Sequence, residues 1–335
     1  MTPYLIYGLR RSYFTRKLEA AFQLMGLPFA YRPKDATIAP DVEAGAGTHQ
    51  IPALQAPDGT WTADTTPIIA RLGPLAGAHA LIPDSPEGIV VRLVEEWLDE
   101  WLPRAVIHYR WNYADNAVLS STHMSEEILP GGPSSSQRAI AQGIADWGRR
   151  AARALGVDSP HQQATAEAEV AQLMDVLEAQ LATTRFALGD RACSADATLL
   201  GALNAHLLAE PVTRARLSGC VRVQAWARQP RPSAPGSRLP PFPSVTPFTD
   251  HVLTAMAGTY SAFLVGNAAA LAAGQKAFTI DAYGQPQSYR ARQYPEASRQ
   301  MIQAAVVALC SEDRARVEAW LAARGLGVFL PAADG

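Results

Sequence analysis

The stretch from Tyr4 to Lys17 is the sequence feature that most constrains the fold. Tyr4-Leu5-Ile6-Tyr7 is a short apolar and aromatic run that predicts a buried strand. Gly8 ends this run, and a helix is expected to begin near Tyr13. The reason is that apolar side chains then recur at helical spacing, at Phe14, Leu18, Ala21, Phe22 and Met25. The chain therefore begins with a strand that leads directly into a helix.

Ser12 stands at the expected N-cap of this helix, directly after Arg10 and Arg11. The first N–H groups of a helix have no partner within the helix, and together with the helix dipole they attract anions. A hydroxyl and two cations at such an end indicate an anion-binding site. Ser12 could equally serve only as a helix cap, and this stretch by itself leaves both interpretations open.

The next fifty residues predict three more strands and another helix. Strands are expected at 27–31, at 51–54 and at 60–63, with a turn at Pro57-Asp58-Gly59 before the last of them. Asp64 and Thr65 then open a helix, since an acid and a hydroxyl are typical of a first helical turn.

This order resembles the thioredoxin-like N-terminal domain of the glutathione transferase superfamily. In that family a Ser, Tyr or Cys follows the first strand, an apolar residue and a Pro share a cis peptide bond, and an acid–hydroxyl pair opens the third helix. The corresponding residues here are Ser12, Ile51-Pro52 and Asp64-Thr65. The usual Glu-Ser pair is replaced by Asp64-Thr65, which keeps both chemistries.

The resemblance implies an α/β plus all-α fold with three segments. They are a thioredoxin-like glutathione-binding domain (1–73), an all-helical substrate domain (87–229) and an added C-terminal helical extension (248–330). Within the second segment, 89–112 is expected to be one long helix and 115–136 a flexible crossover. The prolines between 229 and 247 predict an extended connector, because such a run cannot be helical.

A helix-capping box near Cys193 departs from the superfamily pattern. Phe186 to Asp196 resembles the superfamily's entry to a helix, in which a Ser or Thr stands three residues before an Asp. Cys193 occupies that cap position and is a weak hydrogen-bond partner. Either the cap has shifted to Ser194 or the box is degraded.

Composition limits the classes of function. Hydrophobic residues make up 48% of the 335 residues and charged residues 18%, as in a soluble globular protein. A formal net charge of −2 argues against nucleic-acid binding. Three widely spaced cysteines favour neither a disulfide framework nor a metal site. No continuous apolar run reaches the ~18 residues of a membrane span, so we expect no signal peptide, no membrane and a cytoplasmic location.

The chemistry implied by the resemblance is the ionisation of the glutathione thiol. Lowering a thiol pKa by roughly two units needs about 2.7 kcal/mol. A hydrogen bond to a charged group contributes about 1.5–3 kcal/mol and a helix N-terminus up to ~2 kcal/mol. Ser12 donating to the sulfur is therefore sufficient. Arg10, Arg11 and Arg16 would add positive charge, whereas Lys17 is expected to be a solvated surface charge.

The resemblance also assigns the binding of the tripeptide. The backbone of Ile51 would pair with the cysteinyl backbone, Asp64 with the α-ammonium group and Thr65 with the α-carboxylate. Gln50 could reach the glycyl end, and Asp64 could alternatively be only an N-cap. The full predicted set is Ser12 as the catalytic residue, with Arg11, Tyr13, Phe14, Gln50, Ile51, Pro52, Asp64 and Thr65 around glutathione.

The second substrate is expected to meet a stripe on the helix after the linker. Trp101, Arg104, His108 and Trp111 share one helical face, which in this superfamily borders the cleft for the electrophile. An aromatic stripe can equally be core. Part of 248–294 is expected to pack near this helix and narrow the cleft, through Tyr260, Phe263, Asn267 and Tyr289; docking on the back of the helical domain is the alternative.

The sequence thus predicts a glutathione transferase-like enzyme that adds the glutathione thiolate to a small electrophilic, apolar or aromatic substrate. The partners would be glutathione, as co-substrate, and that electrophile, with a possible homodimer and no metal. One alternative is a catalytically weak glutathione- or ligand-binding scaffold. Another is a glutathione-dependent isomerase or ether-cleaving enzyme.

Overall fold

The computed structural model describes residues 3–331, which form two compact units whose segments alternate along the chain. The first unit contains the chain up to Leu81 together with Val106–Ala152 and Ala192–Ser237. The second contains Ile82–Ala105, Arg153–Arg191 and the chain from Arg238 onward. These units cut across the predicted segments 1–73, 87–229 and 248–330, which remain a prediction about sequence domains.

A four-stranded mixed sheet lies at the centre of the N-terminal region, in the order β2-β1-β3-β4. Its strands are β1 (Tyr4–Gly8), β2 (Phe29–Pro33), β3 (Ala53–Gln55) and β4 (Trp61–Ala63). β1 pairs in parallel with β2 and antiparallel with β3, and β3 pairs antiparallel with β4. This is the predicted thioredoxin-like arrangement.

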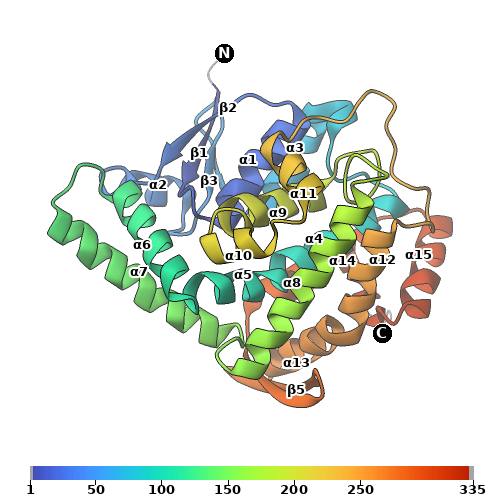
Figure 1. The fold of residues 1–335 in the computed structure, drawn as a ribbon. Coiled ribbons are helices and arrows are strands. Elements are labelled where there is room, and N and C mark those ends of the chain that lie inside the picture. Colours follow the sequence, from blue (N-terminus) through green and yellow to red (C-terminus); the bar gives the residue numbers. More distant parts are fainter. Residues whose placement is uncertain (1–2, 332–335) are drawn as a thin grey trace. The chain divides into compact units, whose positions relative to one another are not determined.

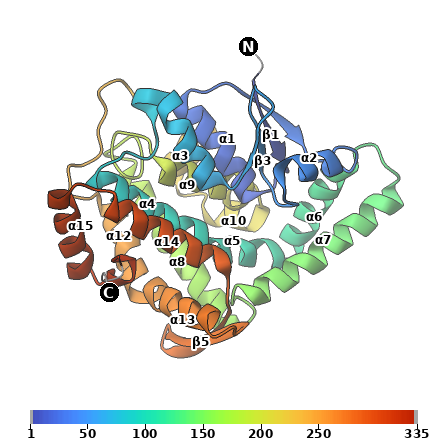
Figure 2. The ribbon, with the colours of Figure 1, turned by 180° about the vertical axis from the view of Figure 1, so that it is seen from behind.

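Three helices flank this sheet. α1 (Tyr13–Met25) and α3 (Thr65–Ala76) pack together on one side, and α2 (Ala39–Ala46) contacts β3 and β4 from the other (Figures 1 and 2). α2 was not predicted. α3 continues past residue 73, the predicted end of the domain, and includes Pro74 in its last turn, where the missing N–H removes a single hydrogen bond.

The rest of the first unit is helical. It consists of the C-terminal part of α5 (Leu102–Trp111), α6 (Ala114–Ile128), α7 (Ser134–Ala154), α9 (Ser194–Ala202), a π-helical turn η2 (Leu203–Leu207), α10 (Pro211–Arg216) and α11 (Val221–Arg228). The crossover expected at 115–136 was wrong, since most of it is α6. Its buried Ser121 and Ser125 donate to carbonyls three residues earlier, which lets a serine-rich helix pack inside the protein.

The helix-capping box is kept, with Cys193 still at the N-cap of α9. The Cys193 N–H donates to the Asp196 carboxylate at 2.8 Å, and its thiol donates to the same oxygen at 3.2 Å. Burial raises the pKa of the Cys193 thiol well above its usual value, so the group keeps the proton that it donates. The cap has therefore not shifted to Ser194.

The second unit is built around α4 (Pro86–Glu100). Its other elements are the start of α5, α8 (Pro160–Gln180), α12 (Pro247–Ala255), a π-helical turn η3 (Met256–Tyr260), α13 (Ser261–Ala272), the hairpin β5 (Ala277–Ala282) and β6 (Gln285–Arg290), α14 (Gln293–Val307) and α15 (Ser311–Ala323). α4 contacts α12, α14 and α15. The single helix predicted over 89–112 is interrupted at Trp101, between α4 and α5.

The sequence-based expectation about membrane segments needs one correction. Among the described residues, the helical segment Pro247–Ala272 is long and apolar enough to cross a membrane by length and composition. Core helices meet the same criterion, which makes this weak evidence. One side of this segment carries the buried Phe248, Phe263 and Tyr260, and the hydroxyl of Tyr260 donates to Glu96.

Candidate active site

The three sequence motifs meet at one edge of the sheet, where β1 and β4 end and β3 begins. Tyr7 pairs with Ala53, so the end of β1 lies beside the start of β3. Ala53 also pairs with Ala63, so the end of β4 lies there too. The Ser12 loop, the Ile51-Pro52 pair and Asp64-Thr65 all adjoin these strand ends, and α1 and α3 both begin there. Two helix N-termini at one edge make it suited to an anionic ligand.

Ser12 is the N-cap of α1, and its hydroxyl oxygen accepts the Thr15 N–H at 3.3 Å. Its own N–H donates to the Leu9 carbonyl at 2.9 Å. The cap uses a lone pair of the hydroxyl and not its proton. Capping and donation to a thiolate are therefore compatible roles for this one side chain.

The cations around Ser12 differ in what they can contribute. Arg10 and Arg16 both form ion pairs with the buried Glu19, so one carboxylate is shared between two positive charges. Arg11 instead donates to the Ala209 carbonyl at 3.2 Å, and its other nitrogen lies 2.7 Å from Nδ1 of His123. Burial lowers the pKa of Arg11, while Glu210 opposes the shift. Arg11 thus bonds to a carbonyl and an imidazole, whereas Arg10 and Arg16 share one carboxylate.

Lys17 corrects the prediction of a solvated surface charge, because it is fully buried. Its ammonium group donates to the Thr66 hydroxyl at 3.1 Å, which joins α1 to the first turn of α3. The tight packing of α1 on α9 explains the burial. A side chain at Gly201 would come within 2.9 Å of the Lys17 backbone nitrogen, so only glycine permits this approach.

The expected glutathione-binding residues lie as follows. The Ile51-Pro52 peptide is cis, as predicted, and Ile51 lies just outside the ladder that ends at Ala53. Gln50 is exposed. Asp64 caps α3 by accepting the Thr66 N–H at 3.4 Å, and its φ is +72°, a conformation that non-glycine residues rarely adopt. Thr65 is buried beside it.

Tyr13, Phe14 and Thr15, which follow Ser12 in α1, differ in their burial. Tyr13 is buried against Phe14 and His206, with ring centroids 5.1 and 6.0 Å away. Phe14 is half-buried. Thr15 is fully buried, and its hydroxyl lies where a side chain at Gly8 would be. Ser12 is thus a better placed hydroxyl than Thr15.

Two of the predicted substrate-pocket residues belong to the first unit. His108 is buried, and its Nδ1 lies 2.9 Å from the amide nitrogen of Asn112. Trp111 is buried against Gly148 of α7 and meets Trp147 edge-on. These contacts favour the core alternative for Trp111, and a substrate-binding role for both residues stays a prediction.

The other two, Trp101 and Arg104, belong to the core of the second unit. Trp101 is 1% exposed and contacts Tyr260, Phe263 and Tyr289, with ring centroids 5.4–5.8 Å apart. Packing of the C-terminal segment on this part of the helix is thus confirmed. All four rings are buried, which favours a core over a cleft wall. Asn267, from the same predicted set, bonds to the backbone of Arg292.

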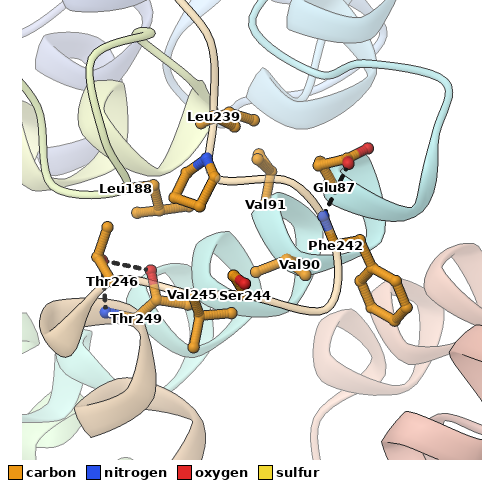
Figure 3. Close-up of a pocket in the computed structure, with 11 residues that line it drawn as sticks. Glu87, Val90, Val91, Leu188, Leu239, Phe242, Ser244, Val245, Thr246 and Thr249 are labelled. Atoms are coloured by element: carbon orange, nitrogen blue, oxygen red, sulfur yellow. Dashed lines mark hydrogen bonds between the residues drawn. The ribbon is translucent and has the colours of Figure 1, made fainter.

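A cavity in the second unit lies between α4 and the proline-rich connector (Figure 3). Glu87 accepts the Phe242 N–H at 2.9 Å on one side, and Thr246 caps α12 on the other. The cavity has a volume of about 20 Å³ and can hold about one water molecule. Sites for small organic molecules are much larger, so this cavity is not a substrate site.

Sequence reasoning missed a buried polar network beside Ser12. Arg110 of α5 pairs with Glu210 at 2.5 Å and also donates to the carbonyls of Arg11 and Ala205, both at 2.6 Å. Ser120 donates to Glu210 at 3.1 Å. Burial raises the pKa of Glu210, and Arg110 opposes this rise. Arg110 adjoins His108 and Trp111 in sequence but carried no motif that would have marked it.

Comparison with known families supports the N-terminal assignment. Residues 11–73 match the family model described as "Glutathione S-transferase, N-terminal domain". The matched range contains Ser12, Ile51-Pro52 and Asp64-Thr65. Residues 11–73 therefore resemble the N-terminal domain of the glutathione transferase superfamily, as predicted, and form a thioredoxin-like domain that is followed by helices. No curated protein matches the chain.

Several solved structures resemble the fold at low identity. A glutathione transferase homologue from Sulfitobacter, solved with bound glutathione, is 16% identical, with 68% of this chain and 92% of that chain covered and a TM-score of 0.40. The β-etherase LigF of Sphingobium is 18% identical, with 68% and 94% covered and a TM-score of 0.45. A glutathione S-transferase from Rhodospirillum rubrum is 16% identical, with 74% and 99% covered and a TM-score of 0.44. Because these scores are below 0.5, only the match of residues 11–73 bears on function.

Proposed function

We propose that this protein is a cytoplasmic glutathione transferase that adds the thiolate of glutathione to a small apolar or aromatic electrophile. The observation that carries the proposal is the position of Ser12. It caps α1 through a lone pair of its hydroxyl, at the sheet edge where α3 also begins. The hydroxyl proton and the N-terminus of α1 would both stabilise a thiolate there.

The remaining residues of the edge would hold the tripeptide. The backbone of Ile51, just beyond the sheet, would pair with the cysteinyl backbone of glutathione. The exposed carboxylate of Asp64 would bind the α-ammonium group, and Thr65, at the start of α3, the α-carboxylate. The positive φ of Asp64 supports this assignment, because strained backbone is concentrated at functional sites.

The reaction needs no other co-reactant. The thiol proton passes to solvent, and the thiolate sulfur forms a bond to the electrophilic carbon. Where that carbon belongs to a double bond, the π bond breaks and its electron pair takes up a proton from solvent. Where that carbon carries a leaving group, the bond to the group breaks and the group departs with its electron pair. The role of the protein is to raise the thiolate fraction at neutral pH and to orient the sulfur.

The experiment is the replacement Ser12→Ala. Removing one charge-stabilising donor typically costs about a hundredfold or more in rate. We therefore expect turnover of a nitroaryl halide to fall by about that factor, and the pKa of the bound thiol to rise when thiolate absorbance is followed against pH. Retention on immobilised glutathione should change little, because the predicted backbone contacts of the tripeptide are kept.

Ser159→Ala is the matched control, because Ser159 caps α8 in the same way by accepting the Gln162 N–H at 3.2 Å. It should cost about 1 kcal/mol of stability and leave the thiol pKa unchanged. An unchanged thiol pKa and unchanged turnover in Ser12→Ala would show that Ser12 is only a cap. Retention of the wild type on glutathione without turnover of any electrophile would favour the binding scaffold.

A further inference from the structure

We propose that Arg110 is the positioning residue of the Ser12 loop: it fixes the Arg11–Ser12 peptide and thereby the direction of the Ser12 hydroxyl. This inference rests on the proposed function, because the hydroxyl matters only if it faces a thiol. Arg110 does not itself touch the predicted position of the thiol. It acts through the backbone of the loop.

The guanidinium group of Arg110 is held in three directions. Nε donates to Glu210 Oε1 at 2.5 Å, Nη1 to the Arg11 carbonyl at 2.6 Å and Nη2 to the Ala205 carbonyl at 2.6 Å. Ala205 lies in η2, and Glu210 is the N-cap of α10. The planar fork therefore links the loop before α1 to η2 and α10, and each of its three partners is at least 95 residues from Arg110 in the chain.

The peptide between Arg11 and Ser12 is fixed on both of its polar sides. Its carbonyl accepts from Arg110, and its N–H, that of Ser12, donates to the Leu9 carbonyl at 2.9 Å. A planar peptide held at both ends cannot rotate. Since the side chain of Ser12 leaves the next α-carbon, this restraint places its Cα–Cβ bond, and the Thr15 N–H that the hydroxyl oxygen accepts at 3.3 Å then selects the direction of the hydroxyl.

The network is built inside the protein and not on its surface. Arg110 is 3% exposed, Glu210 and Ser120 are completely buried, and Ser120 adds a hydrogen bond to Glu210. A buried ion pair contributes little net stability, since desolvation offsets the attraction. The Arg110–Glu210 pair does define local geometry, because its hydrogen bonds form only when both side chains lie in fixed positions. A role in orienting the loop explains this pair better than stability alone.

The test is Arg110→Lys, which keeps the charge but cannot make three forked hydrogen bonds. A small misplacement of a catalytic group can cost up to about a hundredfold in rate. We expect kcat to fall about tenfold to a hundredfold and the pKa of the bound thiol to rise. The KM for glutathione should change less than about threefold, because Ile51, Asp64 and Thr65 are untouched. A merely structural role would not move the thiol pKa.

Asn116→Ala is the matched control. Asn116 is also buried and also joins α5 to α10, since its amide donates to the Tyr109 carbonyl at 2.8 Å and accepts the Val212 N–H at 3.4 Å. Its hydrogen bonds go to these residues and not to the Ser12 loop. This variant should lose stability while the thiol pKa stays at the wild-type value, which separates destabilisation from positioning.

The outcomes are distinguishable. If the wild type ionises glutathione and Arg110→Lys ionises it equally well, the positioning role is overturned and the proposed function stands. If the wild type does not ionise glutathione, both fall. If Arg110→Lys does not fold, Glu210→Gln replaces it, because this change removes the charge that holds Nε. A raised thiol pKa in Glu210→Gln then supports the role, and an unchanged one overturns it.

Discussion

Helix α5 carries two buried arginines, Arg104 and Arg110, that belong to different compact units and have different partners. Each is paired with a glutamate, Arg104 with Glu169 and Arg110 with Glu210. Arg104 also donates to the hydroxyl of Tyr283, at the turn of the β5–β6 hairpin, at 2.5 Å. Arg110 donates instead to the backbone of the Ser12 loop. Arg104 is therefore part of the core of the second unit, whereas Arg110 is part of the candidate site.

The comparison shows that position on a helix does not reveal the function of a buried charge. By sequence, Arg104 was the candidate for substrate binding, because it shares a face with Trp101 and His108, and Arg110 was assigned no role. The partners of both arginines come from segments far away in the chain, and these partners decide the role of each arginine. The same contrast extends to the surroundings, with aromatic rings around Arg104 and backbone carbonyls around Arg110.

The largest expected effect comes from breaking the aromatic core beside Arg104. Trp101→Ala should lower the free energy of unfolding by about 3–5 kcal/mol, because a fully buried ring is replaced by a cavity. The measurement is denaturant unfolding. The control is Trp147→Ala, where the ring is 53% exposed and the loss should be much smaller. Full stability with impaired turnover in Trp101→Ala would instead restore the substrate-pocket interpretation.

The buried carboxyls of the two units give the next contrast. Glu210 pairs with an arginine, whereas Glu96 accepts hydrogen bonds from the hydroxyls of Tyr260 and Ser298. Burial, with a smaller contribution from Glu100, raises the pKa of Glu96 to about 8. Between pH 4.5 and 8 the folded protein keeps a proton that the unfolded chain loses. This part of the stability, on the order of a few kcal/mol, is therefore present at low pH and is lost as pH rises through that window.

Glu96→Gln should remove this dependence, because an amide stays neutral at every pH. Unfolding midpoints of wild type and variant across pH 4.5–8 provide the measurement, and the difference between them should shift steadily in favour of the variant as pH rises. Glu312→Gln, at an exposed carboxyl in α15, serves as the control and should follow the wild type. Parallel profiles for Glu96→Gln and the wild type would contradict the raised pKa.

The smallest effect compares two glycines of α7 in the first unit. A side chain at Gly148 would lie 2.2 Å from the ring of Trp111, whereas one at Gly143 would meet no atom within 4 Å. Gly148→Ala should therefore destabilise by about 1–3 kcal/mol through overpacking. Gly143→Ala should stabilise by up to about 1 kcal/mol through helix propensity. Thermal unfolding measures both, and equal effects would show that Trp111 moves aside easily.

Most of the N-terminal site could be predicted because its signals are local. The strand before Gly8, the hydroxyl at the N-cap and the Ile51-Pro52 pair are each recognised within a few residues. α2 was missed because its sequence, APDVEAGA, contains little apolar periodicity. α6 was taken for a crossover because its serines suggest a loop, and only their hydrogen bonds to backbone carbonyls make them compatible with a buried helix.

The sequence by itself determined the sheet edge, its two helix N-termini and the hydroxyl between them, because hydrophobic periodicity and turn chemistry act over short distances. The tertiary structure alone decided which charges reach that edge. Glu19 pairs with both Arg10 and Arg16, packing on α9 buries Lys17, and the buried Arg110 joins the loop to Glu210. Ion pairs and burial depend on which distant segments meet, and no local pattern in the chain records that.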